Sequence, residues 1–171
     1  MKTLIISSSL SKLSKSFLLC KKVKDKLSSY NLEVEIFDCR TINLSPFHLP
    51  KSEGMLDLEN KISLADNYII AMGVHNYSIN DSLKIILDRC FQNVEGKFFG
   101  IICAAGGEKS YLSTMHLTQI CMNEWKMIQL PRIVYASQKD FIDNEKVSTE
   151  TIKWIELFCK EFFEIGNKLK L

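Results

Sequence analysis

The 171-residue sequence lacks the short motifs that identify many nucleotide and metal enzymes. It contains neither Gly-x-x-x-x-Gly-Lys-Ser/Thr nor Gly-x-Gly-x-x-Gly, which disfavours a P-loop ATPase and a Rossmann dinucleotide site. There is no His-Glu-x-x-His, and the three histidines stand alone, so metal catalysis has little support. The absence of Gly-x-Ser-x-Gly argues against a serine hydrolase.

Strong charge of one sign and long apolar runs are also missing. The formal net charge is +2, with 46% hydrophobic and 25% charged residues, which is ordinary for a globular protein and does not predict a nucleic-acid partner. No apolar run approaches the roughly 20 residues of a membrane-spanning helix. The apolar run at residues 4–6 is too short for a signal-peptide core. We therefore expect one domain over residues 1–171, located in the cytoplasm, with no membrane partner.

The six cysteines form no Cys-x-x-Cys pair, and most of them fall within apolar helix or strand patterns. Disulfides and metal ligation are the less favoured alternatives, because common redox and zinc motifs need paired spacing. We expect buried free thiols at Cys20, Cys39, Cys90, Cys103, Cys121 and Cys159.

Apolar patterns predict five strands that alternate with five helices. Short β-rich runs predict strands at residues 3–7, 32–37, 67–72, 98–103 and 129–136. Amphipathic patterns predict helices at about residues 16–27, 55–64, 78–90, 110–126 and 148–168. The spacing Ser78-x-x-Asp81 resembles a capping box at the start of the third helix. In the last helix, we expect one stripe to pack in the core and not to hold a cofactor: Trp154, Ile155, Phe158, Phe162 and Ile165.

This alternation predicts an α/β three-layer sandwich, in which a five-stranded parallel sheet has helices on both faces. Glu33 and Glu35 alternate with apolar residues, which is typical of a strand at the sheet edge. We expect the strand order 2-1-3-4-5, because it places the ends of strands one, three and four side by side. Unusual turns follow these three strands, and ligands of open α/β sheets bind in the crevice at such ends.

The first turn, residues 7–16, is rich in serine and leads into a helix. Hydroxyls and unpaired N–H groups at a helix N-terminus suit a phosphate. Ser9, Ser11, Ser14 and Ser16 can supply several donors without a metal. The alternative is a solvated stretch that only caps the helix.

The second and third turns offer planar side chains and glycines. His75 and Tyr77 could pack against a flat heterocycle; the alternatives are a simple turn and a general-acid role for His75. In the third turn, Gly106 and Gly107 allow backbone amides to approach a ligand closely, unless the turn is merely flexible.

At these turns the sequence resembles the NADPH-dependent FMN reductase family, which includes related quinone, azo and chromate reductases. The resemblance extends from Lys2 to the final helix. The family's first loop is Gly-Ser-x-Arg-x-x-Ser-x-Asn, and residues 8–16 match it at Ser9 and Ser14, with serine at the Gly, Arg and Asn positions. The family's Pro-x-Tyr-Asn-x-Ser followed by Leu-Lys is matched by Asn76, Ser78, Leu83 and Lys84, whereas Gly73 and His75 replace Pro and Tyr. Residues 105–107 resemble the family's Gly-Gly turn.

The resemblance implies a flavodoxin-like fold, FMN as the cofactor and NADPH or NADH as the electron donor. It implies that hydride passes to the flavin and that electrons then pass to a small-molecule acceptor, such as a quinone or free flavin. A homodimer or homotetramer is expected, and no side chain is assigned as acid, base or metal ligand. The implied cofactor-binding residues are Ser7, Ser9, Ser11, Ser14, Ser16, Met72, Gly73, Val74, His75, Asn76, Tyr77, Ala105, Gly106 and Gly107.

Within this set, the resemblance places the phosphate at the serines of the first loop and the ring edge along the backbone of residues 72–77. The amides of Gly106 and Gly107 would lie near the part of the ring that gains negative charge on reduction. Two other functions stay open: a flavodoxin-type electron carrier, and a flavin-less interaction module that keeps the fold.

Overall fold

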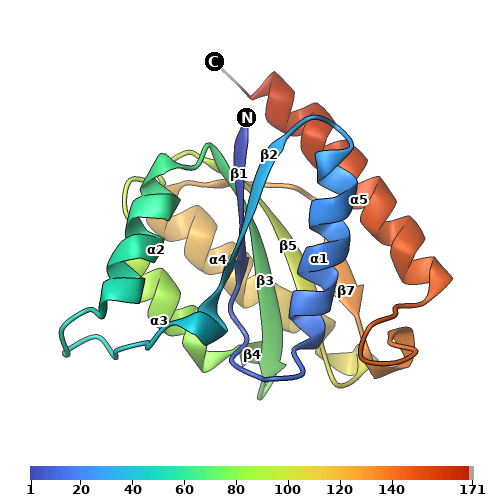
Figure 1. Ribbon diagram of the computed structural model, residues 1–171, viewed down its shortest axis with the longest axis horizontal. Helices are drawn as coiled ribbons and strands as arrows, with labels where there is room; N and C mark the ends of the chain where they lie inside the picture. Colours follow the sequence, from blue (N-terminus) through green and yellow to red (C-terminus); the bar gives the residue numbers. More distant parts are fainter. Residues whose placement is uncertain (170–171) are drawn as a thin grey trace.

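The structure, a computed structural model, describes residues 1–169 of the chain, and a twisted sheet forms its middle layer (Figure 1). The strand order is β2-β1-β3-β5-β6, with β7 also paired to β5. All pairs are parallel except β3 with the short β4. The strands are β1 (Lys2–Ser7), β2 (Glu33–Asp38), β3 (Asn67–His75), β4 (Ser78–Ile79), β5 (Phe98–Ala104), β6 (Ile128–Gln129) and β7 (Val134–Ala136).

The three-layer α/β sandwich is confirmed, with one difference in the strand order. Labelled along the chain, the order is 2-1-3-5-6 instead of 2-1-3-4-5. The two-residue β4 accounts for the shift in numbering, because the sequence pattern does not reveal it. The fifth predicted strand is divided into β6 and β7, and Pro131, which has no N–H to donate, lies between them. The second predicted strand does lie at the edge, as β2.

Helices cover both faces of the sheet (Figure 1). One face packs against α1 and α5, and the opposite face packs against α2, α3 and α4. The α-helices are α1 (Lys15–Ser28), α2 (Glu53–Leu64), α3 (Asp81–Cys90), α4 (Thr114–Trp125) and α5 (Thr149–Lys168). Short 3₁₀ helices are η1 (Cys39–Thr41), η2 (Glu108–Ser113) and η3 (Gln138–Asp140). Among residues 1–169, no helix is both long and apolar enough to cross a membrane.

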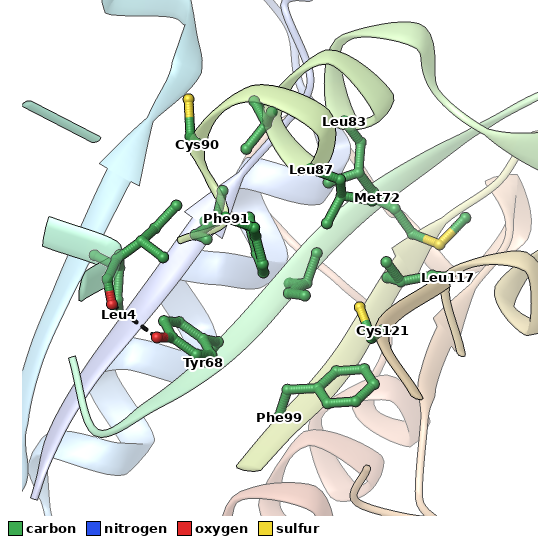
Figure 2. Close-up of a cluster of buried hydrophobic side chains, with 14 of the residues drawn as sticks. Leu4, Tyr68, Met72, Leu83, Leu87, Cys90, Phe91, Phe99, Leu117 and Cys121 are labelled. Carbon is green, nitrogen blue, oxygen red and sulfur yellow. Dashed lines mark hydrogen bonds between the residues drawn. The ribbon is translucent and has the colours of Figure 1, made fainter. Parts of the chain in front are cut away.

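The central strands alternate between two hydrophobic clusters, as the period of two in a strand requires. Tyr68 and Ile70 of β3 face the α2, α3 and α4 side, whereas Ile69 faces α1 and α5. Figure 2 shows Tyr68, Phe91 and other members of the first cluster. The Tyr68 hydroxyl donates to the carbonyl oxygen of Ile62 at 2.7 Å, which satisfies its polar group in the core.

All six cysteines are buried free thiols, as predicted. Four of them lie in the cluster against α2, α3 and α4, and burial raises the pKa of two of these four, Cys103 and Cys121, to about 12. A thiol with so high a pKa is protonated at neutral pH, so these cysteines act as small apolar side chains.

Three helix predictions need correction. The Ser78-x-x-Asp81 capping box does not form, because Ser78 lies in β4 and its Oγ is hydrogen-bonded to Nδ1 of His116 at 2.9 Å. Trp154 lies outside the core stripe of α5: it is 46% exposed, since Ile155 takes the inward position. The helix predicted from residue 110 is divided into η2 and α4.

Candidate functional site

The carboxyl ends of β1, β3 and β5 lie side by side, at the lower end of the sheet in Figure 1. Ser7 of β1 pairs with Ala71 of β3, and Gly73 of β3 pairs with Ala104 of β5. The turns that follow these strands therefore meet. Between them is a hollow of about 340 Å³, which we call the strand-end hollow; it is lined by Ser9, Ser11, Leu13, Ser14, Lys15, Ser16, Gly73, Ala104, Ala105, Gly106 and Gln138.

A larger hollow, of about 760 Å³, lies on the helical face between α3 and α4. Phe47, Phe91 and Trp125 are among its lining residues, and none of the predicted cofactor-binding residues is. Volume alone does not select a site, and in open α/β sheets the strand ends are where ligands bind.

Serine hydroxyls and the N-terminus of α1 form one end of the strand-end hollow. Ser14 is the N-cap residue: its Oγ accepts from the Phe17 N–H at 3.1 Å and is hydrogen-bonded to the Oγ of Ser16 at the same distance. The preceding helical N–H groups, those of Lys15 and Ser16, belong to the first turn, where a helix provides no internal acceptors. The Ser9 Oγ accepts from the Ser11 N–H at 3.3 Å. This end can bind an anion through hydroxyls, amides and the positive end of the helix dipole.

Arg40 contacts the first loop without lining the hollow. Its guanidinium donates to the carbonyl oxygen of Lys12 at 3.2 Å and forms an ion pair with Asp38. Lys15 is the charged member of the hollow's lining, so the lining carries positive and no negative side-chain charge. The balance of charge favours an anionic ligand.

The second turn is a β-hairpin, which the sequence does not predict. β3 continues to His75 and pairs with β4, while Asn76 and Tyr77 form the turn with φ values of 49° and 59°. Two consecutive positive φ values are typical of a two-residue type I′ hairpin turn. The strand predicted to end at residue 72 therefore continues to His75, and a simple turn from that strand into the helix is wrong.

The hairpin determines which residues of the second turn reach the hollow. Gly73 lines it, and a Cβ added there would meet no atom within 4 Å. Met72 is fully buried in the core, and Val74 packs against the same core. His75 is exposed beside Asp81, with its Nδ1 3.5 Å from a carboxylate oxygen. Within residues 1–169, the lining does not include Met72, Val74 or the tip of the hairpin (His75, Asn76 and Tyr77).

In the third turn, Ala105 and Gly106 line the hollow, whereas Gly107 does not. The Ala105 N–H donates to the carbonyl oxygen of Ala136 at 2.8 Å. The hydroxyl of Tyr135 donates to the carbonyl oxygen of Gly107 at 2.5 Å and is hydrogen-bonded to Ser110, and burial raises its pKa. β7 therefore holds the turn at both of its ends.

The structure thus brings together half of the predicted residues: Ser9, Ser11, Ser14, Ser16, Gly73, Ala105 and Gly106. Ser7 is fully buried at the end of β1 and outside the lining. Four lining residues are absent from the predicted cofactor-binding set: Leu13, Lys15, Ala104 and Gln138. Leu13, Lys15 and Ala104 are each next to a predicted residue in the sequence, and this position could have indicated them. Gln138 lies in η3, and no local signal connects it to the strand ends.

The family model for NADPH-dependent FMN reductases matches residues 1–141 of this chain. The chain belongs to the NADPH-dependent FMN reductase family. As a member of it, the protein is a flavin-dependent oxidoreductase that uses FMN as cofactor and NAD(P)H as electron donor. The resemblance found in the loop motifs is therefore confirmed. Among curated protein sequences, none matches the chain.

Solved structures with the same fold include other members of this class. An apo NADH:FMN oxidoreductase (EMOB) has a TM-score of 0.80 and 14% identity, covering 99% of this chain and 90% of its own. The NAD(P)H:(acceptor) oxidoreductase FerB from Paracoccus denitrificans has a TM-score of 0.78 and 20% identity, covering 98% of each chain. A flavodoxin from the domain Archaea has a TM-score of 0.71 and 12% identity, covering 98% and 99%. At these identities the likeness establishes the flavodoxin-like fold alone.

Proposed function

We propose that this FMN reductase family member holds FMN in the strand-end hollow and oxidises NADPH or NADH with a small acceptor, such as a quinone or free flavin. The observation that carries the proposal is the meeting of three strand-end turns around one hollow of about 340 Å³. Its size is within the usual range for small-molecule sites.

The lining fits FMN at both ends. Serine hydroxyls, the first turn of α1 and Lys15 form a donor-rich end that suits the phosphate. Gly73, Ala105 and Gly106 form an end with little side-chain volume, where a flat ring can approach the backbone. In this proposal, no side chain on the lining has to act as an acid or base.

FMN, when bound, supplies the hydride and electron transfer, and the protein binds and orients it. The serines of the first loop hold the phosphate, and the backbone of the second turn lies along the ring edge. If FMN is held there, the amides of Gly106 and Gly107 would stabilise negative charge on the ring. Ser7 and the hairpin tip (His75, Asn76 and Tyr77) lie outside the lining, so this proposal gives their side chains no contact with FMN.

A flavodoxin-type electron carrier is the second candidate, because an archaeal flavodoxin shares the fold over 98% of this chain. Such a carrier binds FMN and does not oxidise NADPH itself.

We further expect a homodimer or homotetramer, which light scattering would measure.

The first experiment is an absorption spectrum of the purified protein with FMN, before and after NADPH is added without oxygen. We expect tight FMN binding and rapid bleaching of the visible band, with NADH tested in parallel. Binding without bleaching by either nucleotide would favour the carrier. Failure to bind FMN even at roughly millimolar concentration would overturn the proposal.

Two neighbouring glycines provide a matched test of the hollow. A Cβ at Gly106 or at Gly107 would meet no atom within 4 Å, so both valine variants should fold. Gly106 lines the hollow and Gly107 does not. We therefore expect Gly106→Val to weaken FMN binding by roughly tenfold or more, and Gly107→Val to weaken it less. Equal, wild-type affinity in both variants would show that FMN binds elsewhere.

A further inference from the structure

A buried carboxamide, that of Asn80, joins the first and second turns. Its Oδ1 accepts from the Gly73 N–H at 3.0 Å and from the Ser8 Oγ at 3.1 Å. Its Nδ2 donates to the Ser82 Oγ at 2.7 Å and to the Ser8 carbonyl oxygen at 3.3 Å. Asn80 is only 2% exposed, so these four bonds use the full capacity of a buried amide side chain.

This use of Asn80 departs from what its position predicts. It is the N-cap residue of α3, and an N-cap asparagine normally accepts from an N–H of the first turn. Its side chain makes no such bond here. The helix therefore forgoes an interaction that asparagine commonly provides, and the side chain is directed to the two turns instead.

The same network fixes Ser8 to β3. The single hydroxyl proton of Ser8 is shared between Asn80 Oδ1 and the carbonyl oxygen of Ala71, which lies 2.7 Å from the Ser8 Oγ. The Ser82 Oγ donates to the Ser8 carbonyl oxygen at 2.6 Å. Ser8 directly precedes Ser9, which lines the strand-end hollow, and Gly73 lines it too. The bonds of Asn80 therefore connect two walls of the hollow.

We infer that Asn80 is a positioning residue for cofactor binding: it holds the phosphate end and the ring end at the spacing that one FMN molecule spans. The inference rests on the proposal that FMN binds in the strand-end hollow. Asn80, Ser8 and Ser82 act behind the lining, so their effect reaches the ligand only through the placement of Ser9 and Gly73.

The variants are Asn80→Ala and Ser82→Ala, with Tyr68→Phe as the control. Tyr68→Phe removes another buried hydrogen bond, to Ile62, in a part of the core that does not line the hollow. All three variants lose some stability, which urea unfolding without ligand measures. Dissociation constants are then measured for FMN and for riboflavin, which lacks the phosphate, together with the visible circular dichroism of the bound flavin.

For Asn80→Ala, we expect FMN affinity to fall by about tenfold or more and riboflavin affinity to fall less, because only FMN must contact both ends. Ser82→Ala should give a smaller change in the same direction, and it carries the test if Asn80→Ala does not fold. Tyr68→Phe should leave both affinities and the flavin dichroism unchanged.

Different results would contradict the proposed function and the positioning role of Asn80. A wild-type protein that binds neither flavin would overturn the proposed function. The positioning role alone would be overturned by a different result. In that case the wild type binds FMN, but Asn80→Ala and Ser82→Ala keep the wild-type ratio of FMN affinity to riboflavin affinity.

Discussion

Ser14 is expected to act both on the stability of α1 and on phosphate binding. Its Oγ accepts from the Phe17 N–H at 3.1 Å, and the residue also lines the strand-end hollow. Loss of an N-cap hydroxyl costs about 1 kcal/mol of unfolding free energy. Loss of a hydrogen bond to a charged phosphate costs a further ~1.5 kcal/mol in binding free energy, which is roughly tenfold in affinity. Ser14→Ala should therefore lower both quantities.

Ser9 separates the two effects. Its Oγ accepts from the Ser11 N–H at 3.3 Å, outside the helix, so Ser9→Ala removes a phosphate donor without removing the cap. Combined, Ser9→Ala and Ser14→Ala should weaken FMN binding by roughly 2–3 kcal/mol. Ser29→Ala is the control at the opposite end of α1: its Oγ donates to the Lys26 carbonyl oxygen at 2.6 Å, far from the hollow.

Flavin fluorescence titration measures the affinity, and urea unfolding without FMN measures the stability. We expect weaker binding in both hollow variants, lower stability in Ser14→Ala, and unchanged binding in Ser29→Ala. A double variant with wild-type affinity would show that the first loop does not hold the phosphate. Equal stability of Ser9→Ala and Ser14→Ala would refute the capping role.

Packing, thiol burial and one ion pair give three further expected outcomes. A Cβ at Gly100 would lie 2.6 Å from Phe158 Cζ, so Gly100→Ala should lower the unfolding free energy by about 1–3 kcal/mol in urea denaturation; an unchanged midpoint would contradict this packing. Burial raises the pKa of five cysteine thiols to about 11 or 12. An aromatic disulfide reagent at about pH 8 should therefore label the thiols of the denatured protein and not those of the native protein. Fast labelling of the native protein would contradict the burial of these thiols. Burial acts to raise the pKa of Asp38, but its hydrogen bonds and ion pair with Arg40 outweigh this and lower it. The pair therefore stabilises the fold above the ordinary carboxyl pKa, and this contribution is lost as the pH falls through the lowered value. Asp38→Asn should flatten the unfolding free energy measured between about pH 2 and 5, and parallel curves would refute the coupling.

Much of the fold could be predicted because it depends on local patterns. The run of apolar residues in β1 and the four-residue spacing in α1 are properties of near neighbours, and both elements form within a residue or two of the predicted bounds. The hairpin at Asn76 and Tyr77 was missed, because its signal is backbone conformation and neither residue is glycine. Trp154 was misplaced, because one step along a helix turns a side chain by about 100°.

For the site, the sequence by itself determined the donor-rich first loop, the glycines of the other turns and, through their order, the family. Only the tertiary structure decided which of these residues share one hollow: Gly106 lines it, Gly107 does not, and Gln138 joins it from η3. Only the tertiary structure shows that Asn80 bonds to Ser8, 72 positions earlier in the chain. Hydrophobic periodicity and capping depend on residues within a few positions, whereas a hydrogen bond across 72 positions exists only once strands have paired and helices have packed.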